Sequence, residues 1–287
     1  MSAPLRWPAE ALWEAIAPQW PGFTVEVLPS IDSSNTELMR RARSGQYDPI
    51  LLVAEEQTAG RGRLGRQWQG QPGDTLMFSL GLALAPQDWS GLSLAVGVSV
   101  AESLQPVLPS AGSGQPRLSL KWPNDLWLCN SHGERKLGGI LVETASFVAP
   151  QTQVVPMHTS PATRYVVIGI GLNLRPPDHS GLSLPAAGLQ EIDAHIDAPA
   201  ALLRVVPPLL TMLQAFEHYG FGPVQARFDL RDALQNRSVV LSDGQTGTAH
   251  GVGEDGALRV MTAQGMQCIT SAEISVRPAS AAATLPA

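Results

Sequence analysis

The residues best suited to chemistry lie in a fourteen-residue segment, EEQTAGRGRLGRQW, at residues 55–68. It follows the apolar run 50–54 and places three arginines (61, 63 and 66) among three glycines (60, 62 and 65). Guanidinium groups present forked donors that match phosphate and carboxylate oxygens, and glycine lets backbone approach a ligand closely. The spacing fits neither GxxxxGK[ST] nor GxGxxG. The segment predicts a cationic loop that closes over an anion, with a solvated surface loop as the alternative.

Three further segments combine polar residues or bare backbone with apolar runs. KWPND, at residues 121–125, offers a lysine and two polar side chains able to bind a metal or a ribose, although Pro-Asn-Asp is also a common turn. Lys136 stands before the apolar run 137–144, where Gly138 and Gly139 indicate either a bulge or the close approach of another group. The run IGIGLN, at residues 168–173, again alternates apolar side chains with glycines.

The length, composition and net charge of the chain favour some classes of protein over others. The 287 residues are 44% hydrophobic, which is enough for a sizeable core, and 19 Lys+Arg against 25 Asp+Glu give a net charge of −6. That balance argues against a surface devoted to nucleic acid and favours a small anionic ligand. Cys129 and Cys268 lack zinc or redox spacing, so we expect two reduced core residues. No apolar run approaches the roughly 18–20 residues of a membrane span, so we expect no membrane association and a cytoplasmic protein.

The rest of the pattern predicts the elements that position these segments. Alternation and apolar runs predict strands at 23–28, 50–54, 75–82, 118–122, 126–129, 137–144 and 165–172. Helical spacing predicts helices at 5–20, from a capping box at 34–37 to Gly45, at 92–104, at 199–219 and at 224–235. Pro207-Pro208 should kink or break the helix at 199–219. From residue 237 onward, five short β-like runs predict a small barrel.

The segments between and beyond these elements carry less information. The Pro/Gly/Ser-rich stretches 109–116 and 148–163 are predicted flexible loops, and the tail 279–287 is predicted to be disordered. The single N-terminal helix is too short for a helix-turn-helix domain, so we expect no DNA binding.

Five of the segments, in chain order, closely resemble motifs of the biotin protein ligases: DSSN at 32–35, the GRGRLGRQW loop within 55–68, KWPND at 121–125, KLGGILVE at 136–143 and GIGLN at 169–173. The resemblance implies an α+β fold with a mixed central β-sheet flanked by helices, of the class II synthetase-like type, and a small C-terminal SH3-like β-barrel. The implied domains are a catalytic domain at 1–235, with the short helix in 1–22, a barrel at 236–278 and the tail 279–287. Without the winged helix of members that repress transcription, the chain resembles the monofunctional type.

The resemblance also implies a two-step reaction. Biotin and ATP, with Mg²⁺, would give biotinoyl-5′-AMP and pyrophosphate, and a lysine of the biotin carboxyl carrier protein of an acyl-CoA carboxylase would then accept the biotinoyl group. The implied catalytic residues are Lys136, Arg63 and Lys121. The implied biotin-binding residues are Ser33, Ser34, Asn35, Gln57, Gly60, Arg61, Gly62, Arg63, Lys136, Gly139, Ile140 and Gly169. The implied ATP or adenylate residues are Arg61, Arg63, Arg66, Trp68, Lys121, Asn124, Lys136 and Asn173, with Asp125 as an Mg²⁺ ligand.

Two other functions are alternatives to biotin protein ligation. A lipoate or octanoate protein ligase shares the catalytic fold, but its RRxxGGGxVxHD-like glycine run is absent from the sequence. A non-catalytic biotin-sensing regulator is disfavoured by the missing winged helix and by the retained Lys136 and loop arginines. Relatives cover adenine with a loop that falls at 178–189 here and lacks an aromatic residue. They also commonly pair through the edge of the central sheet, so a homodimer is compatible with the resemblance.

Overall fold

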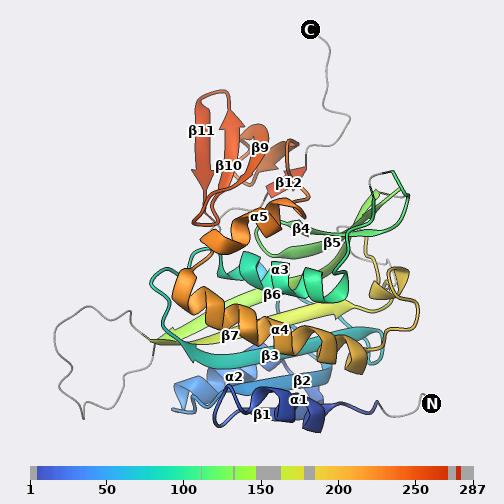
Figure 1. Ribbon diagram of the computed structural model, residues 1–287, viewed down its shortest axis with the longest axis vertical. Coiled ribbons are helices and arrows are strands. Elements are labelled where there is room, and N and C mark those ends of the chain that lie inside the picture. The colour runs from blue at the N-terminus through green and yellow to red at the C-terminus, as the bar shows by residue number, and fades with distance from the viewer. Residues whose placement is uncertain are drawn as a thin grey trace, which may run out of the picture.

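The computed structural model of the chain describes residues 5–110, 112–131, 133–146, 163–177, 185–270 and 276–278 (Figure 1). Its centre is a seven-stranded mixed sheet in the order β1-β2-β3-β7-β6-β5-β4. The strands are β1 (Thr24–Ile31), β2 (Ile50–Gln57), β3 (Thr75–Leu84), β4 (Arg117–Lys121), β5 (Asp125–Asn130), β6 (Gly133–Ser146) and β7 (Arg164–Asn173). The β1–β2 pair is parallel and the other pairs are antiparallel.

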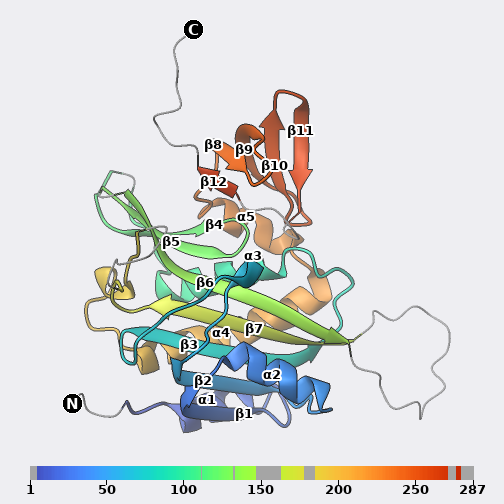
Figure 2. The same ribbon diagram turned by 180° about the vertical axis from the view of Figure 1, so that it is seen from behind.

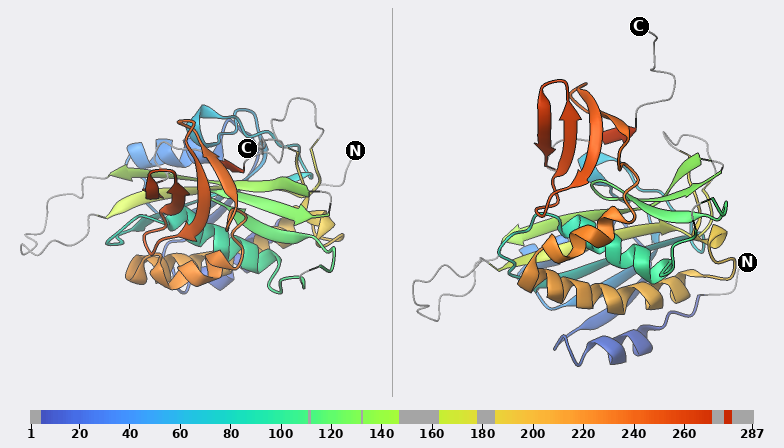
Figure 3. Two further views of the ribbon diagram at one scale, coloured as in Figure 1. Left: turned by 90° about the horizontal axis from the view of Figure 1, so that it is seen from above. Right: turned by 45° about the horizontal axis from the view of Figure 1, so that its top comes forward.

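Helices cover both faces of this sheet. On one face, α3 (Leu92–Leu104) contacts β4, β5 and β6, and α4 (Ala198–Tyr219) packs on α3 and β3. On the other face, α2 (Ser34–Arg43) contacts β2, β3, β6 and β7 (Figure 2), whereas α1 (Ala9–Ile16) contacts β1 and α4 and so lies on the first face. Seen from above, α2 and the loop after β2 lie on the opposite side of the sheet from α3 and α4 (Figure 3, left). The expected α+β class with a mixed, helix-flanked sheet is confirmed.

The small C-terminal sheet extends beyond the β4–β5 end of the central sheet (Figure 3, right). It contains β8 (Ser238–Leu241), β9 (Thr246–Val252), β10 (Leu258–Thr262), β11 (Gly265–Ile269) and β12 (Val276–Pro278), in the order β11-β10-β9-β8-β12. Its pairs are antiparallel, and the sheet fits an SH3-like domain. Trp122, buried at the end of β4, donates from Nε1 to the carbonyl of Gly256 at 3.0 Å. This bond ties the small sheet to the KWPND turn.

Helix α4 continues through Pro207-Pro208, so the predicted break was wrong. Two prolines remove backbone donors and crowd the preceding turn. The apolar residues on either side, Val205, Val206, Leu209 and Leu210, are all nearly or completely buried. Their burial holds the helix together across the pair. By length and apolar composition α4 could cross a membrane, but 56% of its most apolar window is buried within the molecule, as in the core helix of a folded domain.

The helix predicted at 224–235 is shorter than expected. A 3-10 turn, η3 (Gly222–Val224), leads into α5 (Gln225–Asp229), and the chain then leaves the helix. The amide of Leu120 on β4 donates to the carbonyl of Arg231, and the amide of Ala233 donates to the carbonyl of Leu120. Residues 231–233 thus pair with the edge strand β4, which satisfies backbone groups of that edge.

Other local expectations also need correction. The N-terminal helix spans only Ala9–Ile16, and Trp13 on it is 51% exposed. The N-cap of α2 is Ser33 rather than Ser34, because the Ser33 hydroxyl accepts from the amide of Thr36. Cys268 is exposed and Cys129 is partly buried, so the two are not both core residues. Most of the segment 148–163 and the whole tail 279–287 lie outside the described residues.

Candidate functional site

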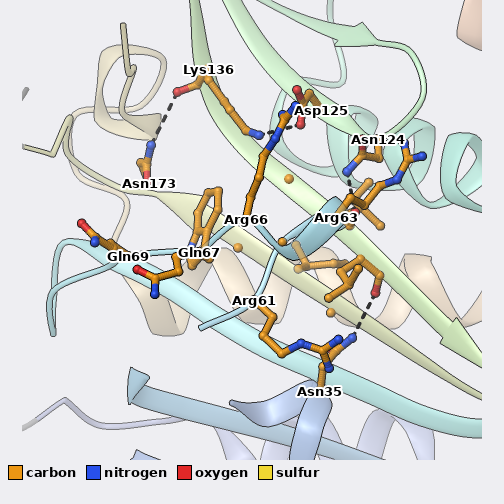
Figure 4. A pocket seen from close by; sticks show the side chains of 18 of the residues that line it. Asn35, Arg61, Arg63, Arg66, Gln67, Gln69, Asn124, Asp125, Lys136 and Asn173 are labelled. Carbon is orange, nitrogen blue, oxygen red and sulfur yellow. Dashed lines mark hydrogen bonds and ion pairs between the residues drawn. The ribbon is translucent and has the colours of Figure 1, made fainter. Parts of the chain in front are cut away.

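A cavity of about 540 Å³ lies between the N-terminal end of α2, strands β5–β7 and the loop after β2 (Figure 4). We call residues 58–70 the arginine loop. All but one of the residues expected to bind biotin, nucleotide or metal line this cavity: Ser33, Ser34, Asn35, Gln57, Arg61, Gly62, Arg63, Arg66, Trp68, Lys121, Asn124, Asp125, Lys136, Gly139, Ile140, Gly169 and Asn173. The exception is Gly60, which is buried in the neck of the loop. Motifs up to 140 residues apart therefore meet at one place.

One end of the cavity carries neutral hydrogen-bonding groups. The Ser34 and Ser79 hydroxyls lie 2.7 Å apart, and Ser79 Oγ donates to Asn35 Oδ1 at 2.6 Å. Gln57 Oε1 accepts from the backbone amide of Ser34 at 2.9 Å. Ser33, Ser34, Asn35 and Ser79 are each no more than 3% exposed. Buried polar groups in such a network are held in fixed orientations, since each unmade bond would be costly.

Asn35 links this neutral end to the first arginine of the loop. Its Nδ2 donates to Glu143 Oε2 at 3.0 Å and to the carbonyl of Leu141 at 3.3 Å. Glu143 in turn pairs with Arg61, whose guanidinium lies 3.1 Å from Oε1 and also donates to Thr36. Arg61 is 48% exposed, so this ion pair contributes modestly to stability. The main effect of the ion pair is on geometry, because it holds one side of the arginine loop over α2 and β6.

The other end of the cavity is cationic. Asp125 Oδ1 lies 2.6 Å from Lys136 Nζ, and its Oδ2 lies 3.9 Å from Lys121 Nζ. Lys121 is 8% exposed and sits 5.3 Å from the centre of the Trp127 ring. Lys136 Nζ sits 5.9 Å from the Trp68 ring. These are the only two lysines in the sequence, and both line the cavity.

Arg63 extends from the loop to the KWPND turn. Its guanidinium donates to Asn124 Oδ1 at 3.2 Å. Asn124 also donates to the carbonyl of Ile140 at 2.8 Å, so this residue both shapes the turn and anchors the loop. Burial lowers the pKa of Arg63 from its ordinary value, while the charge of Asp125 opposes that shift. The guanidinium still stays protonated, because its ordinary pKa is so high.

The arginine loop closes on itself and on strand β7. Backbone bonds join Gly62 to Arg66 and Trp68 to Gly60, and a 3-10 turn spans Arg63–Gly65. A side chain at Gly60 would overlap the backbone of Trp68. The Trp68 ring lies against bare backbone, because a Cβ at Gly171 would sit 2.5 Å from its Cε2 atom. The loop is thus folded over the cavity rather than extended into solvent (Figure 4).

Gly138 on β6 combines the two explanations that the sequence left open. The β5–β6 register shifts between Leu126 and Trp127, which leaves Leu137 as an extra residue on β6, in a bulge next to Gly138. A Cβ at Gly138 would lie 2.6 Å from the carbonyl oxygen of Gly171, so β7 also approaches closely.

Several cavity residues were not predicted from the sequence. They come mostly from apolar strands or from the ends of loops: Leu64, Gln67, Gln69, Phe78, Pro123, Trp127, Glu134, Leu141, Ile170, Gly171, Pro177, Ala186 and Pro278. Ser79 and Glu143 were also missed as members of the hydrogen-bond network. A serine inside the apolar run TLMFSLGL was the available signal for Ser79. The expected adenine loop lies largely outside the described residues, which resume at Pro185.

A metal ligand role for Asp125 does not fit this arrangement. Both of its carboxylate oxygens face lysine ammonium groups, which would oppose a divalent cation at the same oxygens. Among the described residues, no group of three or more His, Cys, Asp and Glu side chains could hold a metal ion. Mg²⁺ in nucleotide sites is commonly held by one or two carboxylates together with substrate phosphates and water. Asp125 therefore positions Lys136 and Lys121 in this structure.

Comparison with known proteins gives a consistent result. The Biotin/lipoate A/B protein ligase family matches residues 27–158. The chain is 32% identical over 269 residues to the bifunctional ligase/repressor BirA of Escherichia coli, covering 91% of this chain and 76% of that protein. It is 29% identical over 256 residues to the biotin–[acetyl-CoA-carboxylase] ligase of Paracoccus denitrificans, covering 86% and 98% respectively.

A solved structure agrees in fold. The biotin protein ligase from Aquifex aeolicus in complex with biotin and ATP superposes with a TM-score of 0.68 at 27% identity, covering 89% of this chain and 99% of that one. Taken with the cavity and its motifs, these similarities show that the chain belongs to the biotin/lipoate A/B protein ligase family.

Proposed function

We propose that the chain is a biotin protein ligase, which activates biotin with ATP and transfers it to a lysine of a carrier protein. The observation that carries this proposal is one cavity with two chemically different ends. A buried neutral network faces one end, and five cationic side chains against two carboxylates line the cavity as a whole. Biotin has a matching polarity, since its ureido ring is neutral and hydrogen-bonding and its valerate ends in a carboxylate.

In the first step, a biotin carboxylate oxygen attacks the α-phosphorus of ATP, the bond to the β-phosphate breaks and pyrophosphate leaves. Two anions must meet, so the barrier depends on fixed positive charge around them. We assign Arg63 and Lys136 to the carboxylate and α-phosphate, and Lys121 and Arg66 to the phosphate side. The contacts of Asp125 with Lys136 and Lys121, and of Asn124 with Arg63, keep three of these cations in place, which reduces the reorganisation needed during reaction.

In the second step, the carrier lysine amine attacks the biotinoyl carbonyl, the bond to AMP breaks and the amine loses a proton. The mixed anhydride must not meet water before the amine arrives. We assign that protection to the arginine loop, with Trp68 as its inner wall. Homologues named as acetyl-CoA-carboxylase ligases support the carboxyl carrier protein of an acyl-CoA carboxylase as the acceptor. The homodimer and the absence of DNA binding stay predictions.

The lipoate ligase alternative is weaker on chemical grounds. The lipoyl dithiolane ring has no N–H and no carbonyl, so it could not pair with the cavity-facing lone pairs of Ser34 Oγ or with the NH₂ group of Gln57, whose other polar atoms are already bonded within the wall. A site built around hydrogen bonds discriminates strongly against ligands that lack them.

Incubation with ATP and labelled biotin or lipoate tests the proposal directly. We expect biotin-dependent pyrophosphate release and transfer of label to a carrier domain, and no transfer of lipoate. Lys136→Met should abolish pyrophosphate release, whereas Arg204→Met, at an exposed ion pair with Asp193, should not. Label transfer from lipoate but not from biotin would overturn the assignment.

A further inference from the structure

Ser79 is completely buried in the largely apolar strand β3, at the centre of the sheet. It does not line the cavity, yet its hydroxyl lies between the two cavity residues Ser34 and Asn35. A buried serine in a central strand has no packing advantage over alanine or valine, so the reason for its presence must lie in its hydrogen bonds.

The direction of those hydrogen bonds follows from what each atom can do. Asn35 Nδ2 faces the carboxylate of Glu143 and the carbonyl of Leu141, which only accept. Its Oδ1 is therefore the atom that faces Ser79. Because Oδ1 can only accept, Ser79 must donate its single proton to it, across 2.6 Å.

Ser34 must then donate to Ser79, because Ser79 has no second proton for the 2.7 Å contact between the two hydroxyls. With its proton directed inward, Ser34 Oγ presents only lone pairs to the cavity. Gln57 is oriented in the opposite sense: its Oε1 accepts from the Ser34 amide, so its NH₂ group remains for a ligand. The wall therefore offers an acceptor and a donor in fixed places.

We propose that Ser79 is a positioning residue that fixes Ser34 as a hydrogen-bond acceptor, so that the cavity selects a ligand with an N–H group at that point. The inference rests on the proposed function, in which the N–H is one of the two in the ureido ring of biotin. The one-way chain runs from Ser34 through Ser79 and Asn35 to Glu143, and its terminal acceptor is held by Arg61.

Binding of biotin analogues to the wild-type chain tests the direction. Each ureido N–H is replaced in turn by a ring oxygen or by a methylene, and dissociation constants are measured by titration calorimetry. At the nitrogen facing Ser34, the oxygen analogue should bind about tenfold or more weakly than the methylene analogue, because two sets of lone pairs would face each other. A hydroxyl free to rotate would donate to the ring oxygen and give the reverse order. That reverse order, or equal affinity at both positions, would overturn the proposal.

The variant Ser79→Ala tests the role of Ser79 itself. Without Ser79 the Ser34 proton can turn toward the ligand, so the oxygen analogue should bind as well as the methylene analogue or better. Ser99→Ala, a buried serine on α3 across the sheet, should keep the wild-type preference. An unchanged preference in Ser79→Ala would refute the role of Ser79, and if this variant does not fold, the wild-type order decides alone. Failure of the proposed function looks different, since the wild-type chain would then neither bind biotin nor release pyrophosphate with it.

Discussion

The substitution Gly171→Ala tests whether the arginine loop shields the reactive intermediate. The added methyl would lie 2.5 Å from Trp68 Cε2 and 2.7 Å from its Cζ2 and Nε1 atoms. Carbon atoms in contact lie about 3.5–4.0 Å apart, so the ring must retreat by about 1 Å or leave its place. On either side, Gly171 pairs through its backbone with Met77 of β3 and Gly139 of β6, and these partners lie within the plane of the sheet, away from the added methyl group. We therefore expect the fold to survive and the loop to open.

The size of the effect follows from what the ring loses. Its contact with Lys136, 5.9 Å from the ring centre, contributes about 0.5–2 kcal/mol. Part of its burial against β7 is lost as well, which brings the total to about 1–3 kcal/mol. A loss of that size shifts the closed-to-open equilibrium roughly five- to 150-fold. Release of biotinoyl-AMP from the closed complex should accelerate by about the same factor.

The assay is a chase experiment on preformed enzyme with labelled biotinoyl-AMP, in which release into solution is followed over time. A double-mutant cycle with Trp68→Ala isolates the contact. Once the ring is absent, Gly171→Ala should add little further release. Wild-type retention of the intermediate by Gly171→Ala, or an equally large effect in the Trp68→Ala background, would refute the reasoning.

Three further changes test other parts of the structure. Asp125→Asn removes the carboxylate that holds Lys136, so pyrophosphate release should slow about ten- to a hundredfold, and an unchanged rate would contradict the positioning role. Burial raises the pKa of Asp232 to about 6, above its ordinary 3.8, so its protonated form stabilises the fold at low pH and this stability is lost as pH rises through 6. Asp232→Asn, which keeps the acceptor for the Leu234 amide, should therefore raise the free energy of unfolding by about 1–3 kcal/mol at pH 8 but hardly at pH 4, as urea unfolding at both values can check. Arg231→Ala removes a buried guanidinium that donates to two backbone carbonyls and should lower the free energy of unfolding by about 3 kcal/mol; a loss below about 0.5 kcal/mol in urea would show that water replaces it.

The cavity residues that sequence reasoning found share one property, which is membership in a short local motif. Arginines among glycines, or a lysine at the end of an apolar run, can be recognised in the sequence by residue type and spacing. Ser79 and Trp127 contribute through the face of a strand on which they lie, and that face depends on pairing with distant strands. Gly60 illustrates the opposite case, because its motif position suggested a ligand contact while its geometry serves the neck of the loop.

Helix boundaries were missed where tertiary contacts outweigh local propensity. The Pro207-Pro208 pair lowers helix propensity locally, but burial of the neighbouring residues on α4 is a property of the whole core. After Asp229 the helical pattern continues in the sequence, yet the backbone of residues 231–233 pairs with β4 instead. Neither the burial of α4 nor the pairing of residues 231–233 with β4 can be predicted from the local sequence alone.

The choice of arginine over lysine connects the composition to the proposed chemistry. The chain has 19 basic residues, and Lys121 and Lys136 are the only lysines among them. A biotinoyl adenylate acylates amines, whereas a guanidinium remains protonated in proteins and is a poor nucleophile. Arginine therefore supplies positive charge at the remaining sites without offering a side-chain amine for self-acylation. The two side-chain amines that the chain does carry lie inside the cavity beside Asp125, where the proposed reaction uses their charge.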